Sequence, residues 1–398
     1  LRTAMTYDFD RHIDRRGSGA LKYDALQERY GDASLLPLWV ADMDFATPPF
    51  IIDALRSRLD HPVMGYTVEP ADYRRSIIDW LRELHGVEVR PEWISYIPGI
   101  VKGIGLAINC FTEPGDKVVI MPPVYHPFRM VPEANGRQVV WNPLRELPGG
   151  RYEIDFDNLE NVCAEQSCRM LILSSPHNPA GIAWSPDTLR RLADLCAASG
   201  IMVISDEIHS EMLLHGRKHV PFYAVSESAR CNSITFAAPS KTFNIAGIVS
   251  SYAIVPDDSL RRRFYGFLNA SELDEPPLFS PLATIAAYRE GAKWRRQMLE
   301  YAEGNIAAVC GFCAAHMPRI KALEPDASFL VWLDCRGLQM NHEELNDFFC
   351  RECRLALNDG EMFGPGGRGF MRLNVGAPRA LIMDALERIR AAYNRLNY

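Results

Sequence analysis

The chain has 398 residues, of which 47% are hydrophobic and 23% are charged, which is the balance of an ordinary globular protein. Its formal net charge of −7 argues against a nucleic-acid-binding surface. The sequence has no run of 18 apolar residues, which a membrane span would need. It also has no charged start followed by an apolar stretch, the pattern that predicts a secretory signal. Ten cysteines without such a signal predict reduced thiols in the cytoplasm.

This length predicts more than one domain. Residues 1–48 are expected to form an N-terminal arm that belongs with a smaller domain. Residues 49–290 are expected to form a large domain, and residues 291–398 a small α/β C-terminal domain. Within the large domain, strands alternate with amphipathic helices, which predicts a three-layer α/β sandwich around a mostly parallel seven-stranded sheet. The expected strands are 94–97, 118–121, 138–142, 170–174, 201–205, 233–237 and 250–255.

Two of the early strands end in residues that suit a ligand site. Pro98-Gly99-Ile100-Val101 follows the first strand and begins a helix that runs to Phe111. The first amides of such a helix can bind phosphate, although many glycines at this place serve only close packing. After the strand 118–121, Pro122-Pro123-Val124-Tyr125 predicts either a pocket wall or a packed loop with a buried tyrosine ring.

Three polar residues follow later strands of the sheet. Asn178 comes after the strand 170–174, Asp206 after the strand 201–205, and Lys241 after the strand 233–237. Because ligands bind beyond the carboxyl ends of parallel strands, an amide, a carboxylate and a lysine should converge there. A turn asparagine, a helix-capping aspartate and a surface lysine are the alternatives. Together, the three groups are those that pyridoxal phosphate needs.

Several segments resemble a known family. These are Ser-Ser-Pro-His-Asn-Pro-Ala-Gly at 174–181, Asp-Glu-Ile-His at 206–209 and Pro-Ser-Lys-Thr-Phe-Asn-Ile-Ala-Gly at 239–247. Their residues and order resemble the fold-type I pyridoxal-phosphate enzymes related to aspartate aminotransferase, over nearly the whole chain. Leu-Trp-Val-Ala-Asp-Met-Asp-Phe at 38–45, with His209, resembles the cystathionine β-lyase-like C–S lyases of that superfamily.

The resemblance implies a role for each candidate residue. Lys241 would form a Schiff base with the cofactor and move protons at the substrate Cα, while Asp206 would pair with the pyridine nitrogen and Tyr125 would stack on the ring. Arg372 would bind the substrate α-carboxylate, for which a guanidinium is well suited. The implied cofactor-binding residues are Gly99, Ile100, Val101, Tyr125, Asn178, Asp206, His209, Ser240 and Lys241, with Tyr66 from a neighbouring subunit; Trp39 and Tyr66 would join Arg372 at the substrate.

The chain departs from the aminotransferase pattern at two positions. Many relatives carry tyrosine where this chain has His209, so the histidine is expected to take over the contact with the ring oxygen. Aminotransferases usually carry an arginine eight residues after the lysine, where this chain has Val249. The phosphate is therefore expected to be held by neutral donors or by a basic group from elsewhere, which favours the C–S lyase branch.

Two Cys-x-x-Cys pairs, at 310/313 and 350/353, raise the alternative of a zinc site. Each lies in a helical pattern without glycine turns, where residues three apart share one helix face. We therefore expect no metal. His215 and His219 are interpreted as polar loop residues.

The expected reaction is β-elimination from L-cystathionine or a related L-cysteine S-conjugate, with a thiol, pyruvate and ammonia as products. Each candidate reaction begins with a Schiff base to the substrate and removal of the Cα proton, so an aminotransferase is an open alternative. A pyridoxal-binding regulator without turnover is a second one. Against it, the sequence shows neither a winged-helix segment nor a basic patch. The resemblance further implies a homodimer with its active sites at the subunit interface.

Overall fold

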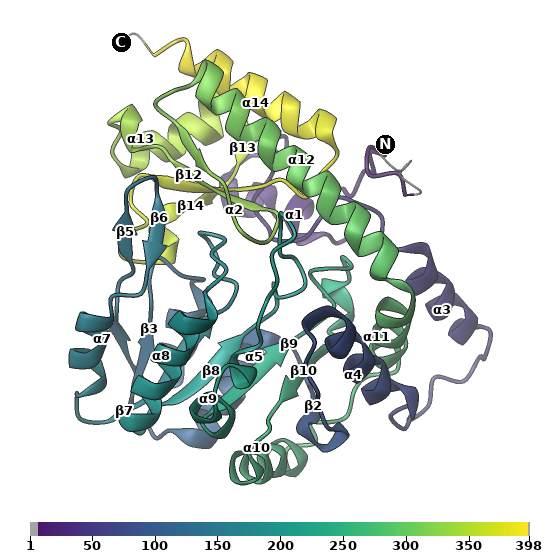
Figure 1. The fold of residues 1–398 in the computed structure, drawn as a ribbon. Coiled ribbons are helices and arrows are strands. Elements are labelled where there is room, and N and C mark those ends of the chain that lie inside the picture. The colour runs from purple at the N-terminus through teal and green to yellow at the C-terminus, as the bar shows by residue number, and fades with distance from the viewer. Residues whose placement is uncertain (1–6, 397–398) are drawn as a thin grey trace.

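The larger of the two main sheets contains seven strands in the order β2-β10-β9-β8-β7-β3-β4 (Figure 1). The computed structural model describes residues 7–396, so residues 1–6 of the expected arm and 397–398 of the expected small domain lie outside it. β10 runs antiparallel to β2 and β9, and the other neighbours are parallel. The predicted seven-stranded, mostly parallel sheet is confirmed. Its strands are β2 Ile94–Ile97, β3 Lys117–Ile120, β4 Gln138–Trp141, β7 Cys168–Ser174, β8 Met202–Asp206, β9 Ser233–Ala237 and β10 Ser251–Ile254.

Helices cover both faces of this sheet, because its central strands are apolar on both sides. In β7, Leu171 and Leu173 pack with residues of α7 and α8, while Met170 and Ile172 pack on the opposite face with residues of α5 and α10. The predicted three-layer α/β class is therefore confirmed. The helices between residues 49 and 290 are α3 Pro49–Leu59, α4 Asp72–His85, α5 Ile100–Phe111, α6 Pro127–Ala134, α7 Phe156–Cys163, α8 Pro186–Ala198, α9 Glu227–Cys231, α10 Asp258–Ala270 and α11 Phe279–Glu290.

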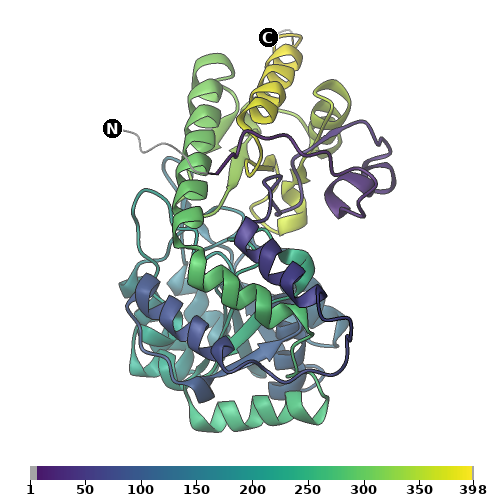
Figure 2. The same ribbon diagram turned by 90° about the vertical axis from the view of Figure 1, so that its right-hand side faces the viewer.

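A second sheet of four antiparallel strands, in the order β11-β12-β15-β14, lies near the C-terminal helix. Helix α12 runs from the seven-stranded part into this smaller part, and the N-terminal segment packs beside it (Figure 2). The short strand β1 pairs in parallel with β13, which ties the N-terminal segment to the smaller part. The elements here are α1 Leu21–Asp24, α2 Leu26–Tyr30, β1 Leu36–Pro37, α12 Ala292–His316, β11 Lys321–Leu323, β12 Leu330–Asp334, α13 His342–Asp347, β13 Leu355–Ala356, β14 Asn358–Asp359, β15 Phe370–Asn374 and α14 Arg379–Tyr393.

The sequence pattern did not reveal one hairpin, which joins the two parts. Strands β5 (Arg145–Leu147) and β6 (Arg151–Glu153) form it, and Figure 1 shows it rising from the seven-stranded part toward the smaller sheet. Glu146 accepts two hydrogen bonds from Arg336, at 2.7 and 3.0 Å. Gly150 lies so close to Leu323 that a Cβ at this glycine would fall 2.4 Å from the leucine side chain.

The helical pattern around Cys350 and Cys353 does not form one regular α-helix. Helix α13 stops at Asp347, and a π-helical turn, Phe348–Glu352, follows it. The backbone is then extended at Leu355, which pairs with Leu36. Among residues 7–396, no helix has both the length and the apolar run that crossing a bilayer takes.

Candidate active site

Lys241 lies in the turn that follows β9. Its Nζ donates a hydrogen bond to the main-chain oxygen of Ala41 at 2.6 Å. Burial is the largest influence on the pKa of Lys241, which is lowered to about 8. The carboxylates of Asp42 and Asp206 raise this pKa, and the guanidinium of Arg372 lowers it. The unprotonated share of this amine near neutral pH is therefore much larger than that of an ordinary lysine, as suits a nucleophilic lysine.

Asp206 is the last residue of β8 and is buried. Its Oδ1 accepts the main-chain N–H of Ile208 at 3.1 Å. Burial raises the pKa of Asp206 to about 7, against the effects of the Ile208 N–H and the Lys241 charge. Lys241 and Asp206 each shift the pKa of the other, so the structure brings these two predicted residues together. A cationic ring nitrogen beside Asp206 would favour its carboxylate form.

Arg372 lies on β15, in the smaller sheet, and reaches the edge of the larger one. Its Nη1 donates to Oδ1 of Asn178 at 2.9 Å, and its Nη2 donates to Oδ1 of Asn358 at 2.6 Å and to the main-chain oxygen of Trp39 at 3.1 Å. The side chain is buried, and burial lowers its pKa to about 10. Its Nε has no hydrogen-bond partner among the described residues. This guanidinium is thus placed to receive a carboxylate.

Tyr125 and His209 lie close enough to Arg372 for its charge to affect the pKa of each. Burial raises the pKa of Tyr125, which the Arg372 charge lowers and the Asp206 charge raises. Burial also lowers the pKa of His209 to about 3, and the cations Lys241 and Arg372 lower it further. His209 is therefore neutral at pH 7, and its buried Nδ1 has no hydrogen-bond partner within the described part of the chain.

The start of α5 contains the residues predicted to bind the phosphate, Gly99, Ile100 and Val101. Gly99, its N-cap, has φ +115°, a backbone conformation that favours glycine. The amides at Ile100 and Val101 belong to the first helical turn, whose N–H groups have no carbonyl partner within the helix. Val249, which stands at the sequence position where the family pattern has an arginine, lies beside this turn, since its Cγ1 would be 3.9 Å from a Cβ at Gly99. Val249 itself has φ +56°, a strained conformation for a β-branched residue.

Two predicted residues are placed differently from the rest. The indole of Trp39 packs edge-on against Tyr30 and donates to the main-chain oxygen of Lys22 at 2.9 Å, so Trp39 meets Arg372 through its main-chain carbonyl. Tyr66 is fully exposed and does not lie at the site of its own chain; its expected contact with a neighbouring subunit stays a prediction. The sequence reasoning missed Ala41 and Asn358, because a main-chain oxygen and a single amide carry no recognisable pattern.

The unused donors around Lys241 suit pyridoxal phosphate. The aldehyde would meet Lys241, and the ring nitrogen would meet Asp206. Oδ1 of Asn178 is occupied by Arg372, which leaves its Nδ2 hydrogens, with His209, for a ring oxygen. The phosphate would lie at the first turn of α5, which favours anions, although no arginine stands at position 249. The residues present therefore fit this cofactor.

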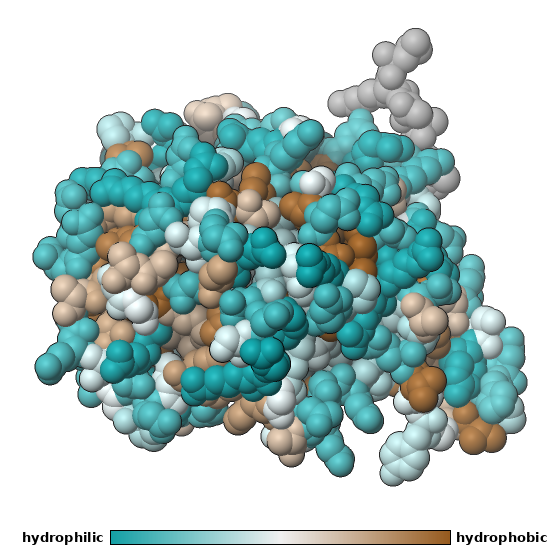
Figure 3. Space-filling model, turned by 60° about the horizontal axis from the view of Figure 1, so that its bottom comes forward, coloured by the Kyte–Doolittle hydropathy of each residue, from teal (hydrophilic) through white to brown (hydrophobic). Residues whose placement is uncertain are grey.

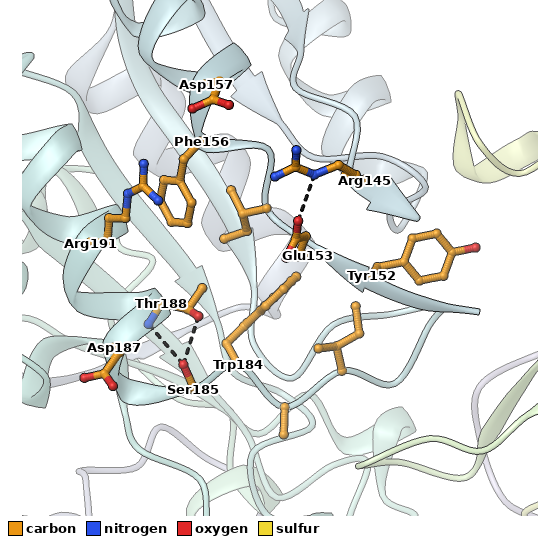
Figure 4. A pocket seen from close by; sticks show the side chains of 13 residues that line it. Arg145, Tyr152, Glu153, Phe156, Asp157, Trp184, Ser185, Asp187, Thr188 and Arg191 are labelled. Atoms are coloured by element: carbon orange, nitrogen blue, oxygen red, sulfur yellow. Dashed lines mark hydrogen bonds and ion pairs between the residues drawn. The ribbon is translucent and has the colours of Figure 1, made fainter. Parts of the chain in front are cut away.

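A cavity of about 470 Å³ lies apart from Lys241, between the hairpin β5–β6 and the starts of α7 and α8. Figure 4 shows the Arg145–Glu153 ion pair on one side of it and Arg191 beside Phe156 on another. Trp184 lines this cavity, and its Nε1 donates to the main-chain oxygen of Ser174 at 2.9 Å. The cavity therefore lies next to the loop that carries Asn178, and none of the predicted site residues lines it.

The cysteine pairs and the histidine pair show no metal-binding arrangement. Within the described residues, no three His, Cys, Asp or Glu side chains form a group that could hold a metal ion, and the ten cysteines are free thiols. The interpretation of His219 as a polar loop residue is wrong. His219 is buried, and its Nε2 lies 2.7 Å from Oε2 of Glu207, because a carboxylate next to Asp206 needs a partner of its own.

Comparison with known proteins agrees with this geometry. The model of the family "Aminotransferase class I and II" matches residues 34–389. The chain is 42% identical to cystathionine beta-lyase PatB of Bacillus subtilis over 97% of this chain and 99% of that protein. It superposes with a TM-score of 0.95 on cystalysin from Treponema denticola, a structure that contains a pyridoxal 5′-phosphate cofactor, at 34% identity over 99% of this chain and all of that one. It superposes with a TM-score of 0.91 on a PLP-bound C–S lyase from Staphylococcus hominis, at 30% identity over 98% of both chains.

Proposed function

Since this chain belongs to the family of class I and II aminotransferases, we propose that it is a pyridoxal-phosphate-dependent C–S β-lyase. It would cleave L-cystathionine or a related L-cysteine S-conjugate to a thiol, pyruvate and ammonia. The observation that carries the proposal is the meeting of Lys241, Asp206 and Arg372 at one edge of the sheet. The likeness to a cystathionine β-lyase over nearly the whole chain selects this reaction from those of the family.

Each residue of the site has one task in this reaction. When bound, pyridoxal phosphate supplies an electron sink that makes the substrate Cα–H acidic. Asp206 would hold the ring nitrogen in its protonated form, and Arg372 would bind the substrate α-carboxylate through its unused Nε. Lys241 would take the Cα proton, because its amine is buried and its pKa is lowered. Tyr125 would stack on the cofactor ring, and His209 would bond to the ring oxygen, so that the ring is held in one orientation.

The net reaction balances with one water. The Cα proton moves to Lys241, and the Cβ–S bond breaks with its electron pair leaving on sulfur, which takes up a proton to become the thiol. Release of the three-carbon fragment and its hydrolysis give pyruvate and ammonia. For L-cystathionine, the thiol is homocysteine. An aminotransferase would instead pass the amino group to a keto acid and would release no thiol.

We further propose that the protein acts as a homodimer in the cytoplasm. The ten free thiols support a reducing compartment. Residues 62–69, between α3 and α4, carry the exposed apolar side chains Val63, Met64, Tyr66 and Val68. On the side where Figure 1 places α3, Figure 3 shows hydrophobic side chains on a protrusion of the surface. A second copy would cover this segment, and Tyr66 would then reach the partner's phosphate.

The decisive experiment follows the products. Protein loaded with pyridoxal phosphate should release thiol and pyruvate in equal amounts from L-cystathionine. Lys241→Ala should abolish both, whereas Lys293→Ala, at an exposed lysine of α12, should not. Transfer of the amino group to a keto acid without thiol would overturn the lyase in favour of an aminotransferase. Cofactor binding with neither product would indicate a regulatory protein.

A further inference from the structure

Residues 38–45, which we call the crossing segment, pass between the two main sheets and contact Lys241 through Ala41. Amide side chains from both sides hold its main chain. From the smaller sheet, Nδ2 of Asn374 donates to the oxygens of Val40 and Asp42, at 2.5 and 2.7 Å. From the turn after β9, Asn244 accepts the N–H of Met43 at 3.0 Å and donates to the oxygens of Met43 and Phe45, both at 2.8 Å. The segment is therefore rigidly placed.

Ala41 lies between these anchors, and its carbonyl is the group that accepts a hydrogen bond from Nζ of Lys241 at 2.6 Å. A carbonyl accepts but does not donate, so this contact is available to the amine and is stronger for the ammonium form. Lys241 carries a proton immediately after it has taken one from Cα. The carbonyl of Ala41 is thus placed to accept a hydrogen bond from the protonated amine that forms when Lys241 takes the Cα proton.

Two basic side chains, Arg15 and Lys22, pair with the two acids of the crossing segment, Asp42 and Asp44. Lys22 is fully buried, and its Nζ lies 2.7 Å from Oδ2 of Asp44. Arg15 donates from Nη1 to Oδ1 of Asp44 at 2.8 Å and from Nη2 to Oδ2 of Asp42 at 2.6 Å. Burying such charges offers little stability over apolar packing. The buried Lys22–Asp44 pair therefore calls for a reason other than stability.

Asp42 directly follows Ala41, whose carbonyl accepts the hydrogen bond from Lys241. The charged groups that face Lys241 are Asp42 from the crossing segment, Asp206 from β8 and Arg372 from β15; His209 also faces it and is neutral at pH 7. After burial, the Asp42 carboxylate has the largest effect on the pKa of Lys241, and it raises this pKa. Arg15 fixes the carboxylate that has this effect.

We propose that the crossing segment positions the amine of Lys241 through the carbonyl of Ala41, and that Asp42, held by Arg15, is a positioning residue that stabilises the protonated amine. This inference rests on the proposed function, since it concerns the same lysine. It assigns a role in proton transfer to Asp42. The Arg15–Asp42 pair would then tune how readily Lys241 takes and returns the Cα proton.

The test reads the amine directly, in the full-length protein without cofactor. Acetic anhydride labels unprotonated lysines, and mass spectrometry of the peptide that contains Lys241 gives the labelling rate at each pH. Asp42→Asn should lower the midpoint of this pH profile by about one unit, since a nearby opposite charge shifts a pKa by that order. Asp42→Glu should restore most of it. Asp32→Asn is the matched control, because Asp32 also pairs with an arginine, Arg354, at 2.6 Å.

An unchanged midpoint in Asp42→Asn, or an equal shift in Asp32→Asn, would overturn the inference. If Asp42→Asn does not fold, Arg15→Gln provides the test: it should lower kcat about tenfold with KM nearly unchanged, and a KM effect alone would count against the proposal. Because the labelling needs neither cofactor nor substrate, a shifted midpoint without thiol release would refute the lyase and leave the role of Asp42 standing.

Discussion

Arg372 and Asn178 are joined by a single hydrogen bond of 2.9 Å, from Nη1 to Oδ1. Arg372 belongs to strand β15 of the smaller sheet, and Asn178 follows β7 of the larger one. The side chain that is expected to bind the substrate carboxylate therefore also orients the amide that is expected to face the cofactor. Any shift of one sheet against the other changes both contacts together.

Arg372→Lys should reduce kcat/KM for L-cystathionine by about 100-fold, which corresponds to roughly 3 kcal/mol. A lysine keeps the charge but loses the fixed guanidinium donors, namely the unused Nε that would meet the carboxylate and the Nη1 that bonds to Asn178. Steady-state kinetics measures the effect. Arg137→Lys is the matched control, because Arg137 is also buried but bonds to Thr112. Equal losses in both variants would show that a buried arginine matters only for folding.

Asp206→Asn should change how the stability of the cofactor-free protein depends on pH. Burial raises the pKa of Asp206 from 3.8 to about 7, so between these pH values the native state binds more protons than the unfolded state. The protonated Asp206 side chain therefore stabilises the folded protein. This stabilisation is fully present below about pH 4 and is lost as the pH rises through 7. A difference of about three between the pKa values corresponds to roughly 4 kcal/mol.

Urea unfolding at several pH values, compared between the wild type and Asp206→Asn, isolates this contribution. The wild type should lose stability relative to the variant as the pH rises from 4 to 7. A constant difference over that range would mean that the carboxyl group titrates near its ordinary pKa in the folded protein.

The sequence predicted those features that depend on local pattern. Strands β7, β8 and β9 are short apolar runs that end in polar residues, so Asn178, Asp206 and Lys241 could be placed at one edge of a sheet. The hairpin β5–β6 was not predicted, because its strands are only three residues long and mostly polar. The burial of Lys22 could not be foreseen either, since its partner Asp44 lies 22 residues away and nothing local marks the pairing.

Val249→Arg should tighten the binding of pyridoxal phosphate about tenfold. The side chain of Val249 faces Gly99 at the start of α5, so an arginine there would add a cation beside the phosphate. It would also replace a β-branched residue at φ +56°, where such residues are strained. Equilibrium dialysis against the cofactor measures the affinity. Gln339→Arg adds the same charge at another left-handed position, φ +58°, and should leave affinity unchanged; weaker binding in Val249→Arg would contradict the placement of the phosphate.

Val68→Asp should convert the proposed homodimer into monomers. Val68 is 87% exposed in the single chain, and burying its carboxylate replacement against a second copy would be costly. Sedimentation velocity at micromolar concentration measures the change, and activity should fall with it, because Tyr66 on the same segment would no longer reach the partner's phosphate. Met130→Asp is the matched control, since Met130 is another exposed apolar residue, 51% exposed, on helix α6. A dimer that persists in Val68→Asp would exclude residues 62–69 from the interface, and monomers in both variants would show that any added charge disrupts assembly.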